Sequence, residues 1–487
     1  MIKRIAGMAT VSAVLCGAIA LCAPAITTKE TQSNETAEPQ MTLQPALENI
    51  TYTIPEQISA DLAGGALDVL HPADDYEKIF PYAAKVVGWK EDSTPVYRYA
   101  VADAAGEQIT NAIYTQAQRA LCGNKNVWLL TGTASDGSTQ MTGAADDGSW
   151  VIGPIGGTIS VKDSCILQQL NGESVTTVYN GSGERLGSVM GTVESCADGV
   201  LVSQREQDGK KTWYFYDAST LKLLTQVDAL QVGAFSDGSA TVQVSENQWG
   251  AVNKNGVITL FNRISWADDV CNGYVLAKNT DGKFGVVDVT GKVIVDFTYI
   301  NGKHCSETDA LYQLWTEKDS CVVISTGWKN KKMVLPSDVK GQELVPLPDN
   351  YFAYTNADGH TVIFDDLKSM ELEDEAVFYE QNDKLIGAMS EGYQIFDLEE
   401  ETLSGLRAYD YVASGSESAQ TDSYFTIANP TTGLQGIGNT KAKTVLRAGY
   451  DSIESVGGGY FAAVQNEWTG IIDSHGKWVV RTQLSGV

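Results

Sequence analysis

The usual signatures of catalysis are missing from this sequence of 487 residues. It contains no GxSxG nucleophile motif, no HExxH metal motif, no P-loop and no glycine-rich nucleotide-binding turn. The four histidines are scattered singly, and no CxxC or Cys/His spacing suggests zinc. We therefore expect no cofactor, no metal site and no catalytic residues. The paired carboxylates of a glycoside hydrolase stay open as an alternative, because their separation is spatial and leaves no sequence motif.

Positive charge is also scarce. The chain has 34 Lys and Arg against 61 Asp and Glu, a formal net charge of −27, and no basic cluster interrupts it. Nucleic acids and anionic lipid surfaces are bound by concentrated positive charge. The composition therefore excludes a nucleic-acid partner, and it leaves contact with a membrane only to a possible N-terminal anchor.

Proline is limited to 12 residues and long helical heptads are not evident, whereas glycine is abundant at 47. Tyr, Trp and Phe are well represented, with 21, 10 and 12 residues. This composition is typical of many short strands joined by glycine turns. Because the chain is too long for one ordinary core, it predicts several domains or a repeat array.

The N-terminus has the layout of an exported protein. Lys3 and Arg4 precede an uncharged run that ends in the small-residue pattern Ala-Pro-Ala at residue 25. This pattern predicts a secretory signal peptide over residues 1–25. An uncleaved membrane anchor is the alternative, because the run approaches the roughly 20 residues that span a bilayer. In both cases the rest of the chain is extracytoplasmic, either secreted or associated with the cell envelope.

Residues 26–48 are polar, rich in Thr, Glu and Gln, and without apolar period, which predicts a flexible linker. The remaining residues, 49–487, carry short apolar runs separated by Gly, Asn and Asp. A lone strand expected at Ile50–Ile54 would help to close or cap this part, because an unpaired strand edge invites aggregation. Six cysteines follow the leader, and their even number permits disulfides without requiring them: Cys122, Cys165, Cys196, Cys271, Cys305 and Cys321.

One stretch, GKFGVVDVTGKVIVDF at 282–297, recurs along the chain. Close copies are QWGAVNKNGVITLF at 248–261 and WTGIIDSHGKWVV at 468–480, and looser copies carry the period further. An anchor position, occupied by Asp288 in the first of these, recurs at a mean interval of about 37 residues in about eleven units. The anchors are Asp103, Ala145, Asn180, Asp217, Asn253, Asp288, Ser325, Asp365, Asp397, Asn439 and Asp473. Such a period predicts tandem units that each bury a face against the next.

Each unit carries three or four short strands. An upstream Tyr-Asp/Glu-x-Ile segment, as at Tyr76 or Tyr450, precedes two strands and a tight turn after the anchor. This content predicts an all-β fold of one or two β-propeller-like rings, with an open β-solenoid as the alternative.

The Trp-Gly pair, the following Asn/Asp-x-x-Gly and the Tyr-Asp-x-Ile lead-in together resemble the WG-repeat (KWG-type) proteins of bacteria. The resemblance covers roughly residues 76–480 and is close around Asn253, Asp288 and Asp473. Only Trp249-Gly250 keeps both signature residues. The resemblance implies an all-β repeat array, often exported and without established catalysis, and it supplies no catalytic residues.

The repeated acidic residues are explained without a ligand. A type I turn favours Asp or Asn at its first position and Gly at its fourth. Five units fit this pattern, with Asp103 and Gly106, Asn180 and Gly183, Asn253 and Gly256, Asp288 and Gly291, and Asp473 and Gly476. Because Asn replaces Asp, these residues are expected to form turns rather than to catalyse.

Function is therefore expected outside the repeated positions. The non-repeating aromatic residues Trp150, Trp266, Trp315 and Trp328 are the candidates for a ligand surface. The aromatic ring that recurs four residues before several anchors, as at Trp213 and Trp249, is expected to pack within its unit or on the next. We predict a non-catalytic, exported binding scaffold with a protein or glycan ligand. The alternative is a carbohydrate-active enzyme or lectin-like glycan binder that uses the non-repeating loops.

Overall fold

The computed structural model describes residues 70–73, 76–134, 136–306, 309–326, 331–365, 367–414 and 417–484. The expected signal peptide, the linker and the strand at Ile50–Ile54 lie outside these residues and stay predictions. Within the described part of the chain, no helix is long and apolar enough to cross a membrane.

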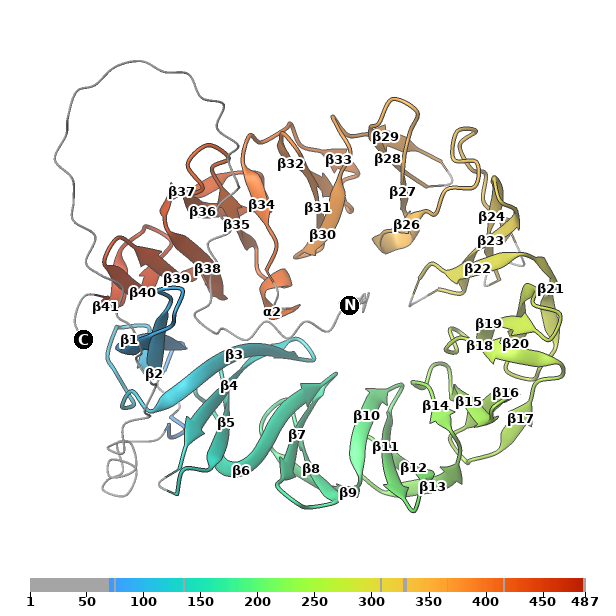
Figure 1. Cartoon of the computed structure of the whole chain (residues 1–487), viewed down its shortest axis with the longest axis horizontal. Coiled ribbons are helices and arrows are strands. Elements are labelled where there is room, and N and C mark those ends of the chain that lie inside the picture. Colours follow the sequence, from blue (N-terminus) through green and yellow to red (C-terminus); the bar gives the residue numbers. More distant parts are fainter. Residues whose placement is uncertain are drawn as a thin grey trace.

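Short antiparallel sheets stand side by side around a ring (Figure 1). We call each sheet a blade, number the blades 1 to 11 in chain order, and name the strands inner, second, third and outer from the centre outwards. The inner strand comes first in the sequence of a blade and the outer strand last. An all-β fold of repeated, propeller-like sheets is therefore confirmed.

Blade 1 contains β1 (Ile79–Trp89) and β2 (Pro95–Asp103), and blade 2 contains β3 (Tyr114–Cys122), β4 (Lys125–Thr133), β5 (Thr139–Ala145) and the first half of β6 (Val151–Lys162). Blade 3 contains the second half of β6, β7 (Cys165–Leu170), β8 (Val175–Asn180) and β9 (Arg185–Met190). Blade 4 contains β10 (Thr192–Ala197), β11 (Val200–Gln207), β12 (Lys210–Asp217) and β13 (Leu223–Asp228). Blade 5 contains β14 (Gln231–Val232), β15 (Ser239–Ser245), β16 (Gln248–Asn253) and β17 (Ile258–Leu260). Blade 6 contains β18 (Ile264–Ala267), β19 (Tyr274–Asn279), β20 (Phe284–Asp288) and β21 (Val293–Tyr299).

Blade 7 contains β22 (Asn301–His304), β23 (Leu311–Glu317), β24 (Ser320–Ser325) and β25 (Lys331–Lys332). Blade 8 contains β26 (Val345–Pro346), the 3-10 turn η1 (Pro348–Asn350), β27 (Phe352–Thr355), β28 (Thr361–Phe364) and β29 (Ser369–Glu371). Blade 9 contains β30 (Val377–Gln381), β31 (Lys384–Met389), β32 (Gly392–Asp397) and β33 (Thr402–Leu403). Blade 10 contains β34 (Asp410–Val412), the helix α2 (Glu417–Gln420), β35 (Tyr424–Ala428), β36 (Gln435–Asn439) and β37 (Thr444–Tyr450). Blade 11 contains β38 (Ser452–Gly457), β39 (Tyr460–Gln465), β40 (Trp468–Asp473) and β41 (Trp478–Gln483).

The sequence repeat matches the blades, with each anchor at the same position in its blade. Every anchor residue ends the third strand of a blade or, for Asp365, follows it directly. The first blades are also joined by hydrogen bonds, because β6 pairs with β5 up to Gly156 and with β7 from Gly157 onwards. As a result β1 to β9 form one continuous sheet, whereas the later blades are separate four-stranded sheets.

Blade 1 departs from the others at its inner side. Ile79 of β1 pairs with the anchor Asp103, as Tyr460 pairs with the anchor Asp473 in blade 11. β1 is therefore a second strand, and the prediction that the Tyr76 segment forms the upstream element of its unit is wrong. Within the described residues, no strand pairs with the other edge of β1.

The last blade packs against the first. The rings of Phe80 in β1 and Tyr460 in β39 lie 4.7 Å apart, and Val456 and Ile471 of blade 11 belong to the same buried cluster as Phe80. Figure 1 shows β40 and β41 beside β1. The array is therefore one closed ring, and the alternatives of two rings or an open solenoid are not formed.

The Trp-Gly signature has a packing role. Trp249 is 7% exposed and packs with Phe261 and Ile264 at the boundary with blade 6. The glycine that follows is required because the outer strand crosses close to it. A Cβ atom at Gly250 would lie only 2.4 Å from the carbonyl oxygen of Thr259. The prediction that the repeated aromatic ring packs between units is confirmed for Trp249.

Candidate functional site

The four candidate tryptophans lie in different surroundings. Trp315 is 8% exposed, and its indole Nε1 donates to the carbonyl of Gly341 at 2.9 Å. Trp150 is half-buried, and its ring covers the turn at Gly183 so closely that a Cβ there would lie 2.5 Å from Cγ of the indole. Trp266 is 38% exposed and lies on the inner strand β18. Trp328 lies outside the described residues. Of the three described rings, Trp266 is the most exposed.

The repeated turn residues are occupied by local hydrogen bonds. Oδ1 of Asp288 accepts from the backbone N–H of Thr290 at 2.9 Å and of Lys292 at 3.0 Å, and Gly291 N–H donates to the Asp288 carbonyl. Gly291 has a φ of 82°, where a side chain is strained. The corresponding backbone bond also closes the other four turns, at Gly106, Gly183, Gly256 and Gly476. The backbone carbonyl oxygens of these anchors therefore accept hydrogen bonds within the turn.

Exposed apolar side chains gather at the inner strands of five consecutive blades. Blades 5 to 9 each present one large apolar residue at, or within two residues of, the start of the inner strand. We call this set the apolar rim. Its members, with their exposed fractions, are Leu230 (50%), Trp266 (38%), Ile300 (45%), Val345 (48%) and Val377 (61%).

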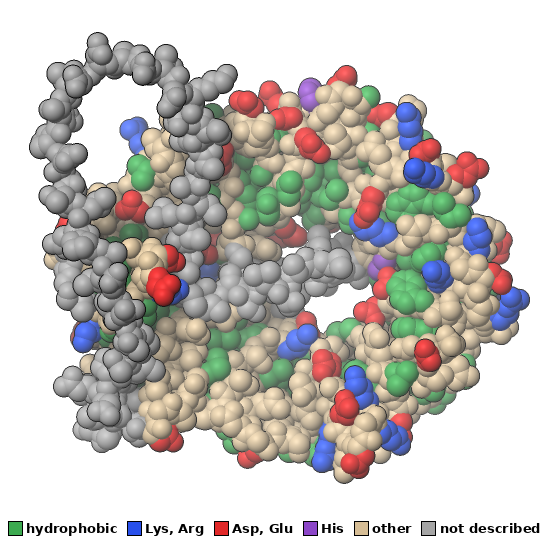
Figure 2. All heavy atoms as spheres, in the orientation of Figure 1, with side chains coloured by type: hydrophobic (Ala, Val, Ile, Leu, Met, Phe, Trp, Pro, Cys, Tyr) green, Lys and Arg blue, Asp and Glu red, His purple; other side chains and the backbone are tan. Residues whose placement is uncertain are grey.

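The apolar rim lies on one face of the ring, because the blades repeat with the same strand direction and the inner strands all start on the same side. Hydrophobic side chains are visible along the inner margin of the ring, around an opening at its centre (Figure 2). Isolated exposed apolar residues are ordinary, but a recurring set around one opening is typical of an interaction surface.

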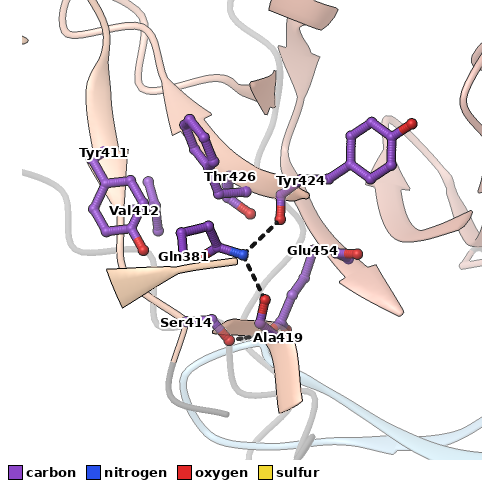
Figure 3. A pocket seen from close by; sticks show the side chains of 10 residues that line it. Gln381, Tyr411, Val412, Ser414, Ala419, Tyr424, Thr426 and Glu454 are labelled. Atoms are coloured by element: carbon purple, nitrogen blue, oxygen red, sulfur yellow. Dashed lines mark hydrogen bonds between the residues drawn. The ribbon is translucent and has the colours of Figure 1, made fainter. Parts of the chain in front are cut away.

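A small hollow, with a cavity volume of about 10 Å³, lies beside the inner strands of blades 9 to 11 (Figure 3). Gln381 at the end of β30 projects into it, and its Nε2 lies within hydrogen-bond distance of the carbonyls of Ala419 and Asp422, 2.6 Å each. These bonds hold the loop that carries α2 against blade 9. Tyr411 of β34 and Glu454 of β38 form further parts of the wall.

Two carboxylates interact electrostatically beside this hollow, Glu454 in its wall and Asp422 nearby. Asp422 accepts from both terminal nitrogens of Arg119, at 2.8 and 3.3 Å, and from the hydroxyl of Ser455 at 2.7 Å. Ser414 donates to Oε1 of Glu454 at 2.7 Å. Burial raises the pKa of Glu454, the nearby Asp422 charge raises it further, and the Ser414 bond and Arg119 act in the opposite direction.

The bonds of these carboxylates are internal to the protein. Arg119 lies on β3 of blade 2, so its ion pair joins blade 2 to the α2 loop of blade 10 across the inner side of blades 11 and 1. Ligand pockets usually measure roughly 300–1,000 Å³. The hollow, with a cavity volume of about 10 Å³, has room for about one water molecule. A second hollow between Tyr114 and Pro154, of about 20 Å³, is little larger. The arrangement therefore fits a structural cross-link better than a reaction centre.

Sequence reasoning missed Arg119, Asp422 and Glu454. Arg119 and Asp422 are 303 positions apart, so no local spacing links them. One feature of the chain does mark this region. The loop between the inner and second strands is longest in blade 10, where α2 is inserted. An insertion into one unit of a regular repeat marks a place where that unit contacts something its sister units do not.

The fold and these sites define an all-β, propeller-like repeat protein with an apolar inner rim and internally paired carboxylates.

No protein-family model matches the chain, and no curated protein matches it. Among solved structures, BamB from Moraxella catarrhalis is 11% identical with a TM-score of 0.30, over 56% of this chain and 91% of that chain. Apo AztD from Citrobacter koseri is 13% identical with a TM-score of 0.29, over 56% and 90%. A eukaryotic initiation factor is 8% identical with a TM-score of 0.39, over 75% and 94%. At these TM-scores the likenesses carry no argument about function.

Proposed function

We propose that this chain is an exported, non-catalytic scaffold of the WG-repeat type that binds a protein partner through the apolar rim. The observation that carries the proposal is the rim itself, because five consecutive blades each expose a large apolar side chain at, or within two residues of, the start of the inner strand. Contacts of this kind are individually weak, and a ring of them suits an extended partner surface rather than a small ligand.

The partner is expected to combine apolar side chains with positive charge. A chain of net charge −27 attracts cationic surfaces over distance and repels anionic ones. The partner class we favour is therefore a basic, amphipathic protein segment. Trp266 is the expected anchor, since exposed aromatic residues contribute most to binding at protein interfaces.

Membership of the WG-repeat type and export rest on the sequence. The Trp249-Gly250 pair, the anchors and the turn glycines support the first, and the N-terminal pattern of residues 1–25 supports the second. The packing of Trp249 and the close approach of Thr259 to Gly250 give that signature a physical reason in this chain.

A glycan-binding or hydrolytic function is the competing proposal, and Glu454 and Asp422 are the observation that favours it. Catalytic acids often have a raised pKa, as Glu454 has. Against it, Asp422 is bonded to Arg119 and Ser455, and the hollow is small. A bound sugar would first have to displace those bonds.

The test uses the purified full-length chain against a displayed random-peptide library and a glycan array. We expect enrichment of peptides that carry both apolar and basic side chains. The rim variant Trp266→Ser/Ile300→Ser/Val377→Ser should bind them at least about tenfold more weakly, since losing one buried anchor costs about 1.4 kcal/mol or more.

A matched control removes three equally exposed apolar residues from outer strands, in the variant Leu223→Ser/Leu260→Ser/Val293→Ser. It should bind like the wild type. Equal binding by the rim variant would contradict the proposal, and saturable hydrolysis of any glycan would establish the enzyme instead.

A further inference from the structure

Two cysteines of neighbouring blades lie in contact. Cys165 begins the second strand of blade 3, and Cys196 lies on the inner strand of blade 4. Their sulfur atoms are 3.1 Å apart, although the residues are 31 positions apart in sequence. Both side chains are buried, at 4% and 8% exposure.

A hydrogen bond from the Cys196 backbone to the Asp163 side chain and the surrounding packing hold the two residues in place. The N–H of Cys196 donates to a carboxylate oxygen of Asp163 at 3.0 Å, and Asp163 belongs to the turn that leads into Cys165. The side chains of Leu167 and Val193 belong to the same buried cluster as the two cysteines, between blades 3 and 4. The contact is therefore part of the packing between the two blades and does not depend on a mobile loop.

A hydrogen bond between the two sulfur atoms makes the two thiols unequal in acidity. The hydrogen bond between the sulfurs lowers the pKa of Cys165 and raises that of Cys196, and burial raises both. Cys165 is therefore the first to carry the thiolate, which is the form that attacks a disulfide.

We propose that Cys165 and Cys196 are a modification site that closes as a disulfide between blades 3 and 4. The oxidant is a disulfide of the surroundings, either a small one such as oxidised glutathione or that of an exported dithiol oxidoreductase. The Cys165 thiolate attacks one sulfur of this disulfide, forms a mixed disulfide and releases one thiolate. Cys196 then loses its proton and attacks the Cys165 sulfur, which expels the second thiolate. Two cysteine sulfurs are oxidised, the external disulfide is reduced to two thiols, and the two protons pass to these leaving groups.

Two other cysteines provide an internal comparison. Cys305 and Cys321 are also buried and belong to one cluster, but their sulfurs lie against the backbone carbonyls of Lys303 at 3.7 Å and Lys340 at 3.2 Å. No sulfur–sulfur contact between these two is present among the described residues. We expect this pair to stay reduced under conditions that oxidise Cys165 and Cys196.

The experiment refolds the purified full-length chain in a glutathione redox buffer, blocks remaining thiols with an alkylating reagent and maps the digest by mass spectrometry. We expect a peptide pair joined through Cys165 and Cys196, lighter by two hydrogen atoms than the reduced pair, with Cys305 and Cys321 alkylated. The variants Cys165→Ser and Cys196→Ser should each lose this species while keeping the wild-type circular dichroism.

The mapping of the wild-type chain decides the proposal even if a variant fails to fold. Alkylation of both Cys165 and Cys196 after equilibration in the oxidising buffer would overturn it. Links distributed evenly over all the cysteines would also overturn it, because they would show that the contact between the two sulfurs does not direct the oxidation.

Discussion

The guanidinium of Arg119 lies 2.8 Å from the carboxylate of Asp422, and the two side chains are only 3% and 10% exposed. This ion pair joins blade 2 to the inserted loop of blade 10 and so crosses the place where the ring closes. Closure is also the place where blade 1 lacks an inner strand among the described residues. The insertion and its ion pair stabilise the ring at this irregular point.

Removing one partner of this ion pair should destabilise the ring strongly. We expect Arg119→Met to cost about 3–5 kcal/mol, because it leaves the buried Asp422 charge without its counter-ion. The double variant Arg119→Met/Asp422→Leu should recover much of this loss. Urea unfolding followed by tryptophan fluorescence measures both effects.

A matched control is the exposed ion pair between Arg263 and Asp281, in which the side chains are 67% and 63% exposed. Arg263→Met should cost no more than about 1 kcal/mol. Equal losses at Arg119 and Arg263 would show that the buried pair has no special part in closure.

Stability should fall as the pH rises through the titration of Glu454. Its pKa is raised in the folded state, so the folded protein binds its proton more tightly than the unfolded chain does. The free energy of unfolding decreases with rising pH wherever the folded state holds more protons than the unfolded chain. This range begins near the unfolded pKa of about 4.3 and ends above the pKa in the folded state. Glu454→Gln should flatten this part of the curve of unfolding midpoint against pH. The exposed substitution Glu391→Gln should leave the curve unchanged, and an unchanged slope in Glu454→Gln would refute the assignment.

The anchor position should tolerate asparagine but not alanine. Asp288→Asn keeps an oxygen that accepts from the N–H groups of Thr290 and Lys292, whereas Asp288→Ala removes it. We expect Asp288→Ala to cost about 1 kcal/mol and Asp288→Asn much less. Thermal unfolding of the two variants compares them directly. Equal losses in the two variants would contradict this expectation, because they would show that the negative charge, which both variants remove, is required.

The glycine of the Trp-Gly pair should resist even the smallest substitution. Gly250→Ala places a methyl group against the backbone of Thr259, which has to move. We expect a loss of about 1–3 kcal/mol, the usual cost of overpacking. Gly405→Ala is the control, because a Cβ atom there meets nothing within 4 Å. Calorimetric midpoints of the two variants should therefore differ clearly, and similar midpoints would remove the packing explanation for the signature.

Much of this fold could be predicted because each unit repeats the same local chemistry. Anchors such as Asp288 and Asp473 mark a turn that recurs along the chain. Even the faint copy at Ser325 falls at a strand end. The position of the Tyr76 segment could not be predicted, because the first unit resembles the others in sequence while its strand occupies the next position outwards.

The sites were much harder to predict. Arg119 and Asp422 are brought together only by closure of the ring, and Trp315 was a ligand candidate until its burial was known. Burial and long-range pairing depend on how the blades meet, and a repeat pattern describes each blade by itself. The apolar rim was missed for a similar reason, since Ile300 and Val377 stand out only when their exposure is known.

Hydrogen–deuterium exchange of the full-length chain, with and without a peptide selected from the displayed library, locates the binding surface. If the apolar rim binds the peptide, exchange should slow at the starts of the inner strands β14, β18, β22, β26 and β30, and the outer strands β13, β17 and β21 should be unchanged. Protection confined to the outer strands, or to the hollow beside Glu454, would contradict binding through the apolar rim.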